Sequence, residues 1–315
     1  MPRESNRCHL AAIWCLVVLA AVLTASPVVA QDLEPRRWAH QPIGTHSTVL
    51  ALATREAEIF FNPIIGITDG TADVNTLFLR YGYAFEWFGK TARVDGVLPY
   101  MSGTWQGLVD GEPGRRSIRD GGDPLLRVSL NLYGAPALTR EAIADYFAEH
   151  PARTTVGVSL AVSLPLGAYD PEELINVGRN RYLLRPQIGV LHTRGSWSFE
   201  LTGSVFVFGD NTDYLESLTL SQRPVYALQG HVTRNFNGGF WLGTGVAYAT
   251  GGVIDIDRTR TRYEVDNLLW TLVGGYRITR RQSVVFSWQQ GRTQTDVGTD
   301  YDSWALSWVY AWGSR

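Results

Sequence analysis

"LFLRYGYAFEW", residues 77–87, places a large apolar side chain at every second position. The positions between them hold Arg80, Gly82, Ala84 and Glu86, together with one phenylalanine. Successive side chains of a β-strand point to opposite faces, so this stretch predicts a strand with one apolar face and one small or polar face. The pattern is typical of a strand that crosses a membrane with lipid on one side and water on the other.

The same alternation returns along the chain, most clearly at 155–164, 197–207 and 303–312. A transmembrane strand needs about 9–11 residues. We expect twelve such strands, at 43–54, 74–87, 90–102, 123–134, 153–165, 180–193, 196–208, 224–236, 239–250, 264–277, 282–291 and 301–312. An even number is the rule for single-chain bacterial barrels.

The connections between these strands alternate in length. Tight turns at 88–89, 194–195, 237–238 and 279–281 alternate with longer polar loops at 55–72, 104–121, 166–179, 209–223, 251–262 and 292–300. Outer-membrane barrels have short periplasmic turns and long external loops. A soluble β-sandwich is the alternative, but it gives such regular alternation no role. We expect an all-β protein, a single antiparallel transmembrane β-barrel of about 12 strands over residues 43–315.

One connection departs from this rule, because residues 139–150 have a helical pattern. Ile143, Tyr146 and Phe147 share one face, and Thr139 is placed to cap the N-terminus. We expect one short periplasmic helix at the membrane surface. Aromatic residues that favour the boundary between membrane and water also fall near this end of the strands: Trp87, Phe88, Tyr133, Trp197, Phe236, Trp241, Tyr276 and Trp312.

The first thirty residues have the layout of a secretory signal peptide. Arg3 and Arg7 precede an apolar run at 10–25, and Val28 and Ala30 stand where signal peptidase requires small residues. An uncleaved anchor is disfavoured because the run is shorter than the ~20 residues of a spanning helix. We expect residues 1–30 to direct export of the chain and then to be cleaved. The expected location is the outer membrane of a Gram-negative cell.

Composition excludes several classes of function. Both cysteines, Cys8 and Cys15, lie in the predicted signal peptide, so the mature chain has neither a disulfide nor a thiolate site. The formal net charge of −2 leaves no basic surplus for nucleic acid.

Residues 31–42 precede the first predicted strand and contain Trp38 and His40. The segment could fold into the lumen as a plug or form a periplasmic N-terminal tail. We favour the periplasmic tail.

Distinctive short sequences are spread over nearly the whole mature chain. They are LEPR at 33–36, FGKTARVD at 88–95 with LPY at 98–100, GDP at 122–124 with Arg127, NLYGAPAL at 131–138, PLGAYD at 165–170, NVGRNR at 176–181, Asp210-Asn211 with Asp213, and QGH at 229–231. Together they resemble a family of outer-membrane transporters named for the MetA pathway of phenol degradation. The resemblance implies an outer-membrane barrel linked to uptake of aromatic or other small hydrophobic compounds.

Alternation also predicts which polar residues line the lumen, since a charge that faces lipid is costly. The candidates are Arg80, Glu86, Arg93, Asp95, Arg127, Asn131, Arg185, Gln187, Glu200 and His231. These residues could form a selectivity zone for a solute or a paired network that fills a narrow lumen. We favour the paired network, because opposite charges on adjacent strands should pair.

No catalytic motif is present: the sequence has no Gly-x-Ser-x-Gly elbow, no His-Glu-x-x-His helix and no P-loop. We expect no enzyme activity, no catalytic residue, no cofactor and no metal. The predicted function is passive uptake of small, aromatic or hydrophobic molecules through an outer-membrane channel. The alternatives are a barrel enzyme that acts on lipid and a closed structural or adhesive barrel. Expected partners are outer-membrane lipid, lipopolysaccharide, the barrel-assembly machinery and the solute, and no nucleic acid.

Overall fold

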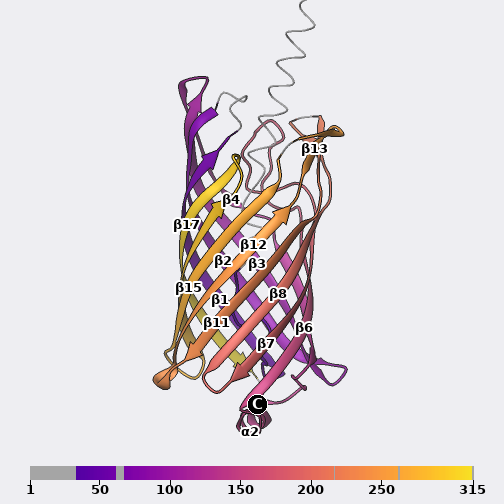
Figure 1. Ribbon diagram of the computed structural model, residues 1–315, viewed down its shortest axis with the longest axis vertical. Helices are drawn as coiled ribbons and strands as arrows, with labels where there is room; N and C mark the ends of the chain where they lie inside the picture. Colours follow the sequence, from indigo (N-terminus) through magenta and orange to yellow (C-terminus); the bar gives the residue numbers. More distant parts are fainter. Residues whose placement is uncertain (1–32, 62–66, 216, 262, 314–315) are drawn as a thin grey trace, which may run out of the picture.

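The computed structural model describes residues 33–61, 67–215, 217–261 and 263–313, and these form a tall barrel of tilted antiparallel strands (Figure 1). The barrel strands are β1 (Thr45–Phe60), β2 (Ile67–Trp87), β3 (Lys90–Val109), β5 (Leu125–Tyr133), β6 (Ala152–Ser163), β7 (Leu183–Arg194), β8 (Trp197–Phe208), β11 (Val225–Asn235), β12 (Phe240–Gly251), β15 (Val265–Arg277), β16 (Gln282–Thr293) and β17 (Gly298–Gly313).

Each barrel strand pairs with the next one along the chain, and β17 returns to β1. The closing pair runs from Thr45 opposite Gly313 to Phe60 opposite Gly298. Closure removes the free strand edges that lipid could not satisfy. The predicted fold, a closed antiparallel barrel of twelve strands, is confirmed.

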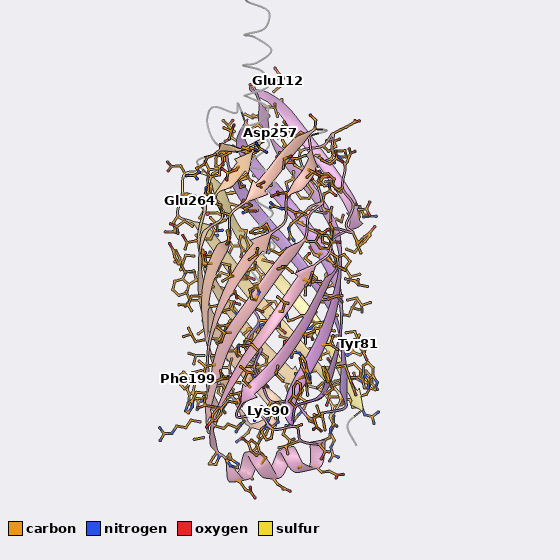
Figure 2. All side chains as sticks on the ribbon, turned by 90° about the vertical axis from the view of Figure 1, so that its right-hand side faces the viewer. Tyr81, Lys90, Glu112, Phe199, Asp257 and Glu264 are labelled. Atoms are coloured by element: carbon orange, nitrogen blue, oxygen red, sulfur yellow. The ribbon has the colours of Figure 1, made fainter. Side chains whose placement is uncertain are left out.

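The barrel is apolar outside and polar inside. On β7, Leu184 and Ile188 are exposed, whereas Arg185 and Gln187 between and beside them are buried. Figure 2 shows side chains that point away from the wall all around the barrel, with Tyr81 and Phe199 labelled among them. A monomeric soluble protein rarely exposes so large an apolar surface. The distribution therefore fits a wall that is surrounded by lipid.

Replacing Leu52 by Arg tests this orientation. Leu52 is 58% exposed in the middle of β1 and lies opposite Leu77 and Leu306, which are also exposed. A guanidinium group at the bilayer midplane should lower the free energy of unfolding by about 2–4 kcal/mol. Urea unfolding in lipid vesicles measures this loss, with Leu52→Ala as the control. Equal stability of the two variants would show that this face does not meet lipid.

Four predicted loops need correction: the described residues of 55–72 and 104–121 are largely strand, and 209–223 and 251–262 contain short strands. β1 continues to Phe60, and β3 turns at Asp110 and Gly111, both at positive φ, into β4 (Glu112–Gly121). These extensions carry polar residues on their outer face, for example the exposed Glu56 and Glu58. Such residues suit a strand that has left the bilayer and is in water on both sides, which is why the polarity there resembled a loop.

A second, four-stranded sheet stands at the end of the barrel that carries the long connections, which we call the long-loop end (Figure 1). It consists of β9 (Asn211–Tyr214), β10 (Leu218–Gln222), β13 (Ile254–Ile256) and β14 (Thr259–Arg260). Its apolar core contains Tyr214, Leu220, Ile254, Ile256 and Tyr263, and Phe61, Leu174 and Val297 from three other connections pack against it. Connections from around the rim therefore meet in one cluster at this end.

The opposite, short-turn end carries the tight turns, among them the 3-10 helix η2 (Asn237–Gly239), and the helix α2 (Arg140–Glu149), which lies across the end of the barrel (Figures 1 and 2). The predicted helix and its cap are confirmed, since the Thr139 hydroxyl accepts a hydrogen bond from the Ala142 amide at 3.4 Å. In the part of the chain that is described, no helix has the length and apolar character needed to cross a bilayer. The predicted boundary aromatics are exposed at this end, except Trp241, which faces inward under Arg36, and Trp312, which is partly buried.

The strand that pairs with β3 changes along its length. β3 pairs with β5 only between Ala92 and Val97. Beyond Val97 it pairs with β4, which is the last strand of its sheet. The connection 164–182 covers the edge of β4, where the Arg116 side chain donates to the Ile175 carbonyl at 2.9 Å and pairs with Glu173 at 2.6 Å. In this part of the wall, side-chain contacts replace strand pairing.

Candidate functional site

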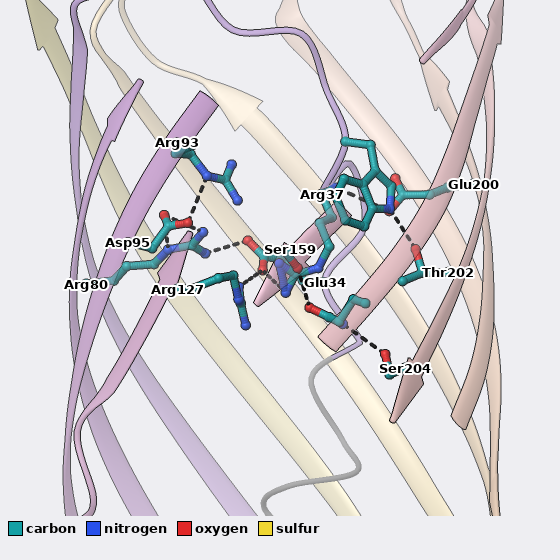
Figure 3. A network of polar contacts seen from close by, with 12 residues as sticks. Glu34, Arg37, Arg80, Arg93, Asp95, Arg127, Ser159, Glu200, Thr202 and Ser204 are labelled. Atoms are coloured by element: carbon teal, nitrogen blue, oxygen red, sulfur yellow. Dashed lines mark hydrogen bonds and ion pairs between the residues drawn. The ribbon is translucent and has the colours of Figure 1, made fainter. Parts of the chain in front are cut away.

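Residues 33–42, which we call the luminal segment, lie inside the barrel. Trp38 is fully buried, and its indole nitrogen donates a hydrogen bond to the Thr202 hydroxyl at 2.8 Å. The backbone amide of Arg37 donates to the Glu200 carboxylate at 3.2 Å. Thr202 and Glu200 both face inward from β8 (Figure 3). The structure thus places a plug where we favoured a periplasmic tail.

Two glycines shape the slot for the Trp38 indole. Gly157 on β6 lies directly opposite Gly189 on β7. A β-carbon at Gly189 would come within 2.1 Å of the Trp38 indole nitrogen, and one at Gly157 within 2.3 Å of the indole ring. Only glycine leaves room for the indole at these two positions, so barrel wall and luminal segment are complementary in shape.

Glu34 carries the negative charge of the luminal segment into a group of arginines. Its carboxylate pairs with Arg80, with Arg127 at 3.3 Å and with Arg37 at 3.4 Å (Figure 3). Burial raises the pKa of Glu34, but Arg80, Arg37 and Arg127 together outweigh burial and hold the pKa well below its usual range. Glu34 is therefore ionised at neutral pH, and its charge attaches the luminal segment to β2 and β5.

Asp95 forms the second negative centre of this network. Its two oxygens accept from Arg80 at 2.9 Å and from Arg93 at 2.8 Å, and its side chain is almost fully buried. In Figure 3 the network continues from Arg93 and Asp95 through Arg80 to Glu34. With Arg37 and Arg127 included, four arginines meet two carboxylates, so this level of the lumen carries an excess of positive charge.

Further contacts hold the luminal segment towards the short-turn end. The Arg36 guanidinium donates to Asn235 and lies 4.2 Å from the centre of the Trp241 ring. The ring of His40 lies 2.7 Å from the Pro136 carbonyl through its Nε2 and packs edge-on against Tyr146 of α2, with 5.5 Å between ring centres. Burial lowers the pKa of His40, which favours its neutral form. The helix α2 is therefore part of the support for the luminal segment.

Nine of the ten predicted lumen residues face the interior. Arg80, Arg93, Asp95, Arg127 and Glu200 contact one another or the luminal segment, and Asn131, Arg185, Gln187 and His231 are buried beside them. Gln187 bridges Ser159 and Ser204, at 3.0 Å and 2.9 Å. The prediction is wrong for Glu86, which is exposed, because β2 has reached the short-turn end there and both of its faces meet water.

The predicted lumen residues include neither Glu34, Arg37 and Trp38 nor the glycine pair that receives the indole. A usable signal was the isolated Trp38 among the charged residues of 33–40, together with inward glycines on two adjacent strands. Within the described residues, no three His, Cys, Asp or Glu side chains lie together as the ligands of a metal ion would.

The closed wall, its apolar exterior and its charged interior define an outer-membrane β-barrel whose lumen holds its own N-terminal segment. Residues 43–304 match the family described as "Putative MetA-pathway of phenol degradation", and the chain belongs to this family. The resemblance seen in the sequence is therefore confirmed. No match was found among curated proteins.

Solved structures share the fold at low sequence identity. An outer membrane channel from Pseudomonas putida F1 is 17% identical, with a TM-score of 0.75, over 89% of this chain and 100% of that chain. The transport unit of the autotransporter AIDA-I from Escherichia coli is 10% identical, with a TM-score of 0.51, over 94% of this chain and 97% of that chain. Both comparisons support the barrel architecture.

Proposed function

We propose that the protein is a passive channel of the Gram-negative outer membrane for small aromatic or other hydrophobic solutes, and that the luminal segment forms its constriction. One observation carries the proposal: the luminal segment fills the interior of the barrel. Side-chain contacts, and no strand pairing, hold it to the barrel wall. The ion pairs of Glu34 and the hydrogen bond of Trp38 can break and form again without unfolding any strand. The family name and the solved channel from Pseudomonas putida F1 support this function.

The interior suits the passage of small molecules more than catalysis. Buried Ser, Thr and Gln side chains line β6, β7 and β8, and they can replace the water shell of a solute step by step. The excess of arginine at the level of Glu34 gives this path a positive potential. A solute would diffuse down its gradient, and the proposal needs no cofactor and no energy coupling.

A second route leads through the wall beside β4. There the connection 164–182 closes the barrel through side chains such as Arg116, and its displacement would open the lumen towards lipid. A hydrophobic solute would leave by this side path more easily than through the charged lumen. Enlargement of the pore when Arg116→Ala loosens this edge would support the lateral route.

A closed structural or adhesive barrel is the second candidate, and the apolar cluster at the long-loop end favours it. Swelling of proteoliposomes separates the two functions. We expect a small aromatic solute to pass faster than a pentose of similar size, with both rates higher after removal of residues 33–42. Vesicles that admit neither solute, with or without these residues, would contradict a channel and support the closed barrel.

A further inference from the structure

An apolar wall with two guanidinium groups lies between the luminal segment and the small outer sheet. Phe206 is fully buried in a cluster with Leu183, and Phe208 packs against the same cluster. The guanidinium of Arg185 lies 4.6 Å from the centre of the Phe206 ring, and that of Arg181 lies 4.8 Å from the centre of the Phe208 ring. Two adjacent levels of the interior therefore combine an aromatic face with a cation.

The guanidinium of Arg181 has few hydrogen-bond partners. The residue is 4% exposed, and its Nη2 donates a hydrogen bond to the Gln222 side chain at 2.6 Å. Its Nη1 atom is buried, and among the described residues it has no hydrogen-bond partner. No carboxylate of the described chain lies at ion-pair distance from this guanidinium. A buried charge of this kind is costly unless a counter-charge reaches it.

The nearby carboxylates Asp210 and Asp123 favour the charged form of Arg181, but neither forms an ion pair with it. Asp123 accepts hydrogen bonds from the backbone amides of Gly167 and Arg179, both at 3.0 Å. Asp210 is exposed, and Arg179 adds a second positive charge. Burial and then Arg179 lower the pKa of Arg181 to about 9, which leaves it charged at neutral pH. Among the described residues, the charge of Arg181 is therefore balanced only by carboxylates beyond ion-pair distance.

We propose that Arg181 and the partly buried ring of Phe208 beside it bind an aromatic carboxylate, and that aromatic acids are the solute class of this channel. The ring of the solute would lie against Phe208, and its carboxylate would accept hydrogen bonds from the planar guanidinium of Arg181, which suits this geometry. The proposal rests on the proposed channel function and names its solute. A molecule that enters past the small outer sheet would meet this site before the luminal segment.

Calorimetric titration of the folded protein in detergent tests the site directly. Benzoate is the probe, benzamide is its neutral match, cyclohexanecarboxylate is its non-aromatic match, and chloride is the simple anion. We expect benzoate to bind most tightly, and Arg181→Gln to weaken its binding about ten-fold, as for loss of a charge-assisted hydrogen bond. Phe208→Leu should remove the preference for benzoate over cyclohexanecarboxylate. Arg194→Gln, an exposed arginine at the far end of β7, is the matched control.

Other results of this titration would contradict the site or its preference for aromatic acids. Equal binding of benzamide and benzoate, or equal effects of the Arg181 and Arg194 variants, would overturn the site. Chloride binding as tight as benzoate binding would reduce it to a general anion site and overturn the aromatic class. Arg181→Lys retains the charge and tests the site should the glutamine variant not fold. Proteoliposomes that swell while benzoate does not bind would refute this inference and leave the channel intact.

Discussion

Removal of residues 33–42 is expected to raise the single-channel conductance severalfold without unfolding the barrel. The deletion takes Trp38 out of the slot between β6 and β8 and releases Glu34 from Arg80 and Arg127. No barrel strand lies in the deleted range, and β1 begins at Thr45. The exposed arginines should also shift the ion selectivity towards anions. Recordings in planar bilayers measure both effects.

The substitution Glu34→Gln shows how much of the conductance effect comes from the charge of the luminal segment and how much from its volume. It keeps the volume of the luminal segment but removes the charge that holds Arg80 and Arg127. We expect a smaller rise in conductance than for the deletion, with the same shift towards anions. Glu86→Gln is the control, because Glu86 is exposed at the end of β2 and lies outside the network. Conductance that is unchanged by the deletion would refute the luminal segment as the constriction.

The second large effect is expected from Gly189→Val. A β-carbon there would lie 2.1 Å from the Trp38 indole nitrogen and 2.7 Å from the Thr202 hydroxyl, both far inside contact distance. Overpacking of this kind typically costs about 1–3 kcal/mol. The luminal segment is held by fewer contacts than the barrel wall, so it should leave its slot first. The variant should conduct like the deletion, and added protease should cleave its N-terminal segment.

A double variant makes this test specific. Adding Trp38→Ala to Gly189→Val removes the clash with the indole and leaves that with the Thr202 hydroxyl, so the pair should be less than additive in conductance and in stability. Gly203→Val on the adjacent β8 is the matched control, since a β-carbon at Gly203 meets nothing within 4 Å. If the Gly189 and Gly203 variants behaved alike, the glycine slot would have no role in seating Trp38.

The barrel itself could be predicted, because the pattern that defines each strand lies within that strand's own sequence. A strand with lipid on one side and a wet lumen on the other must alternate, and each crossing shows this pattern within its own residues. The same holds for the Thr139 cap, which depends on residues three positions apart. Prediction failed where the strands pass beyond the bilayer, because Glu56 and Glu58 then face water from a strand and not from a loop.

The luminal segment could not be predicted in the same way, because its position is a tertiary property. Nothing near Trp38 in the sequence points to Gly157, Gly189 or Thr202, which lie far along the chain on three other elements. Inward glycines alone are expected of any barrel lumen. The lumen charges were placed by alternation, but their counter-charge, Glu34, comes from outside the strands, so the network was incomplete.

The position of Trp38 inside the barrel is the central claim, and photo-crosslinking in intact cells tests it most directly. With p-benzoylphenylalanine at position 38, irradiation should link the luminal segment to peptides of β6, β7 or β8 that contain Gly157, Gly189 or Thr202. Mass spectrometry of the digested protein identifies the linked peptides. Crosslinks that lead only to periplasmic proteins, with none to these strands, would contradict a lumen filled by the N-terminal segment.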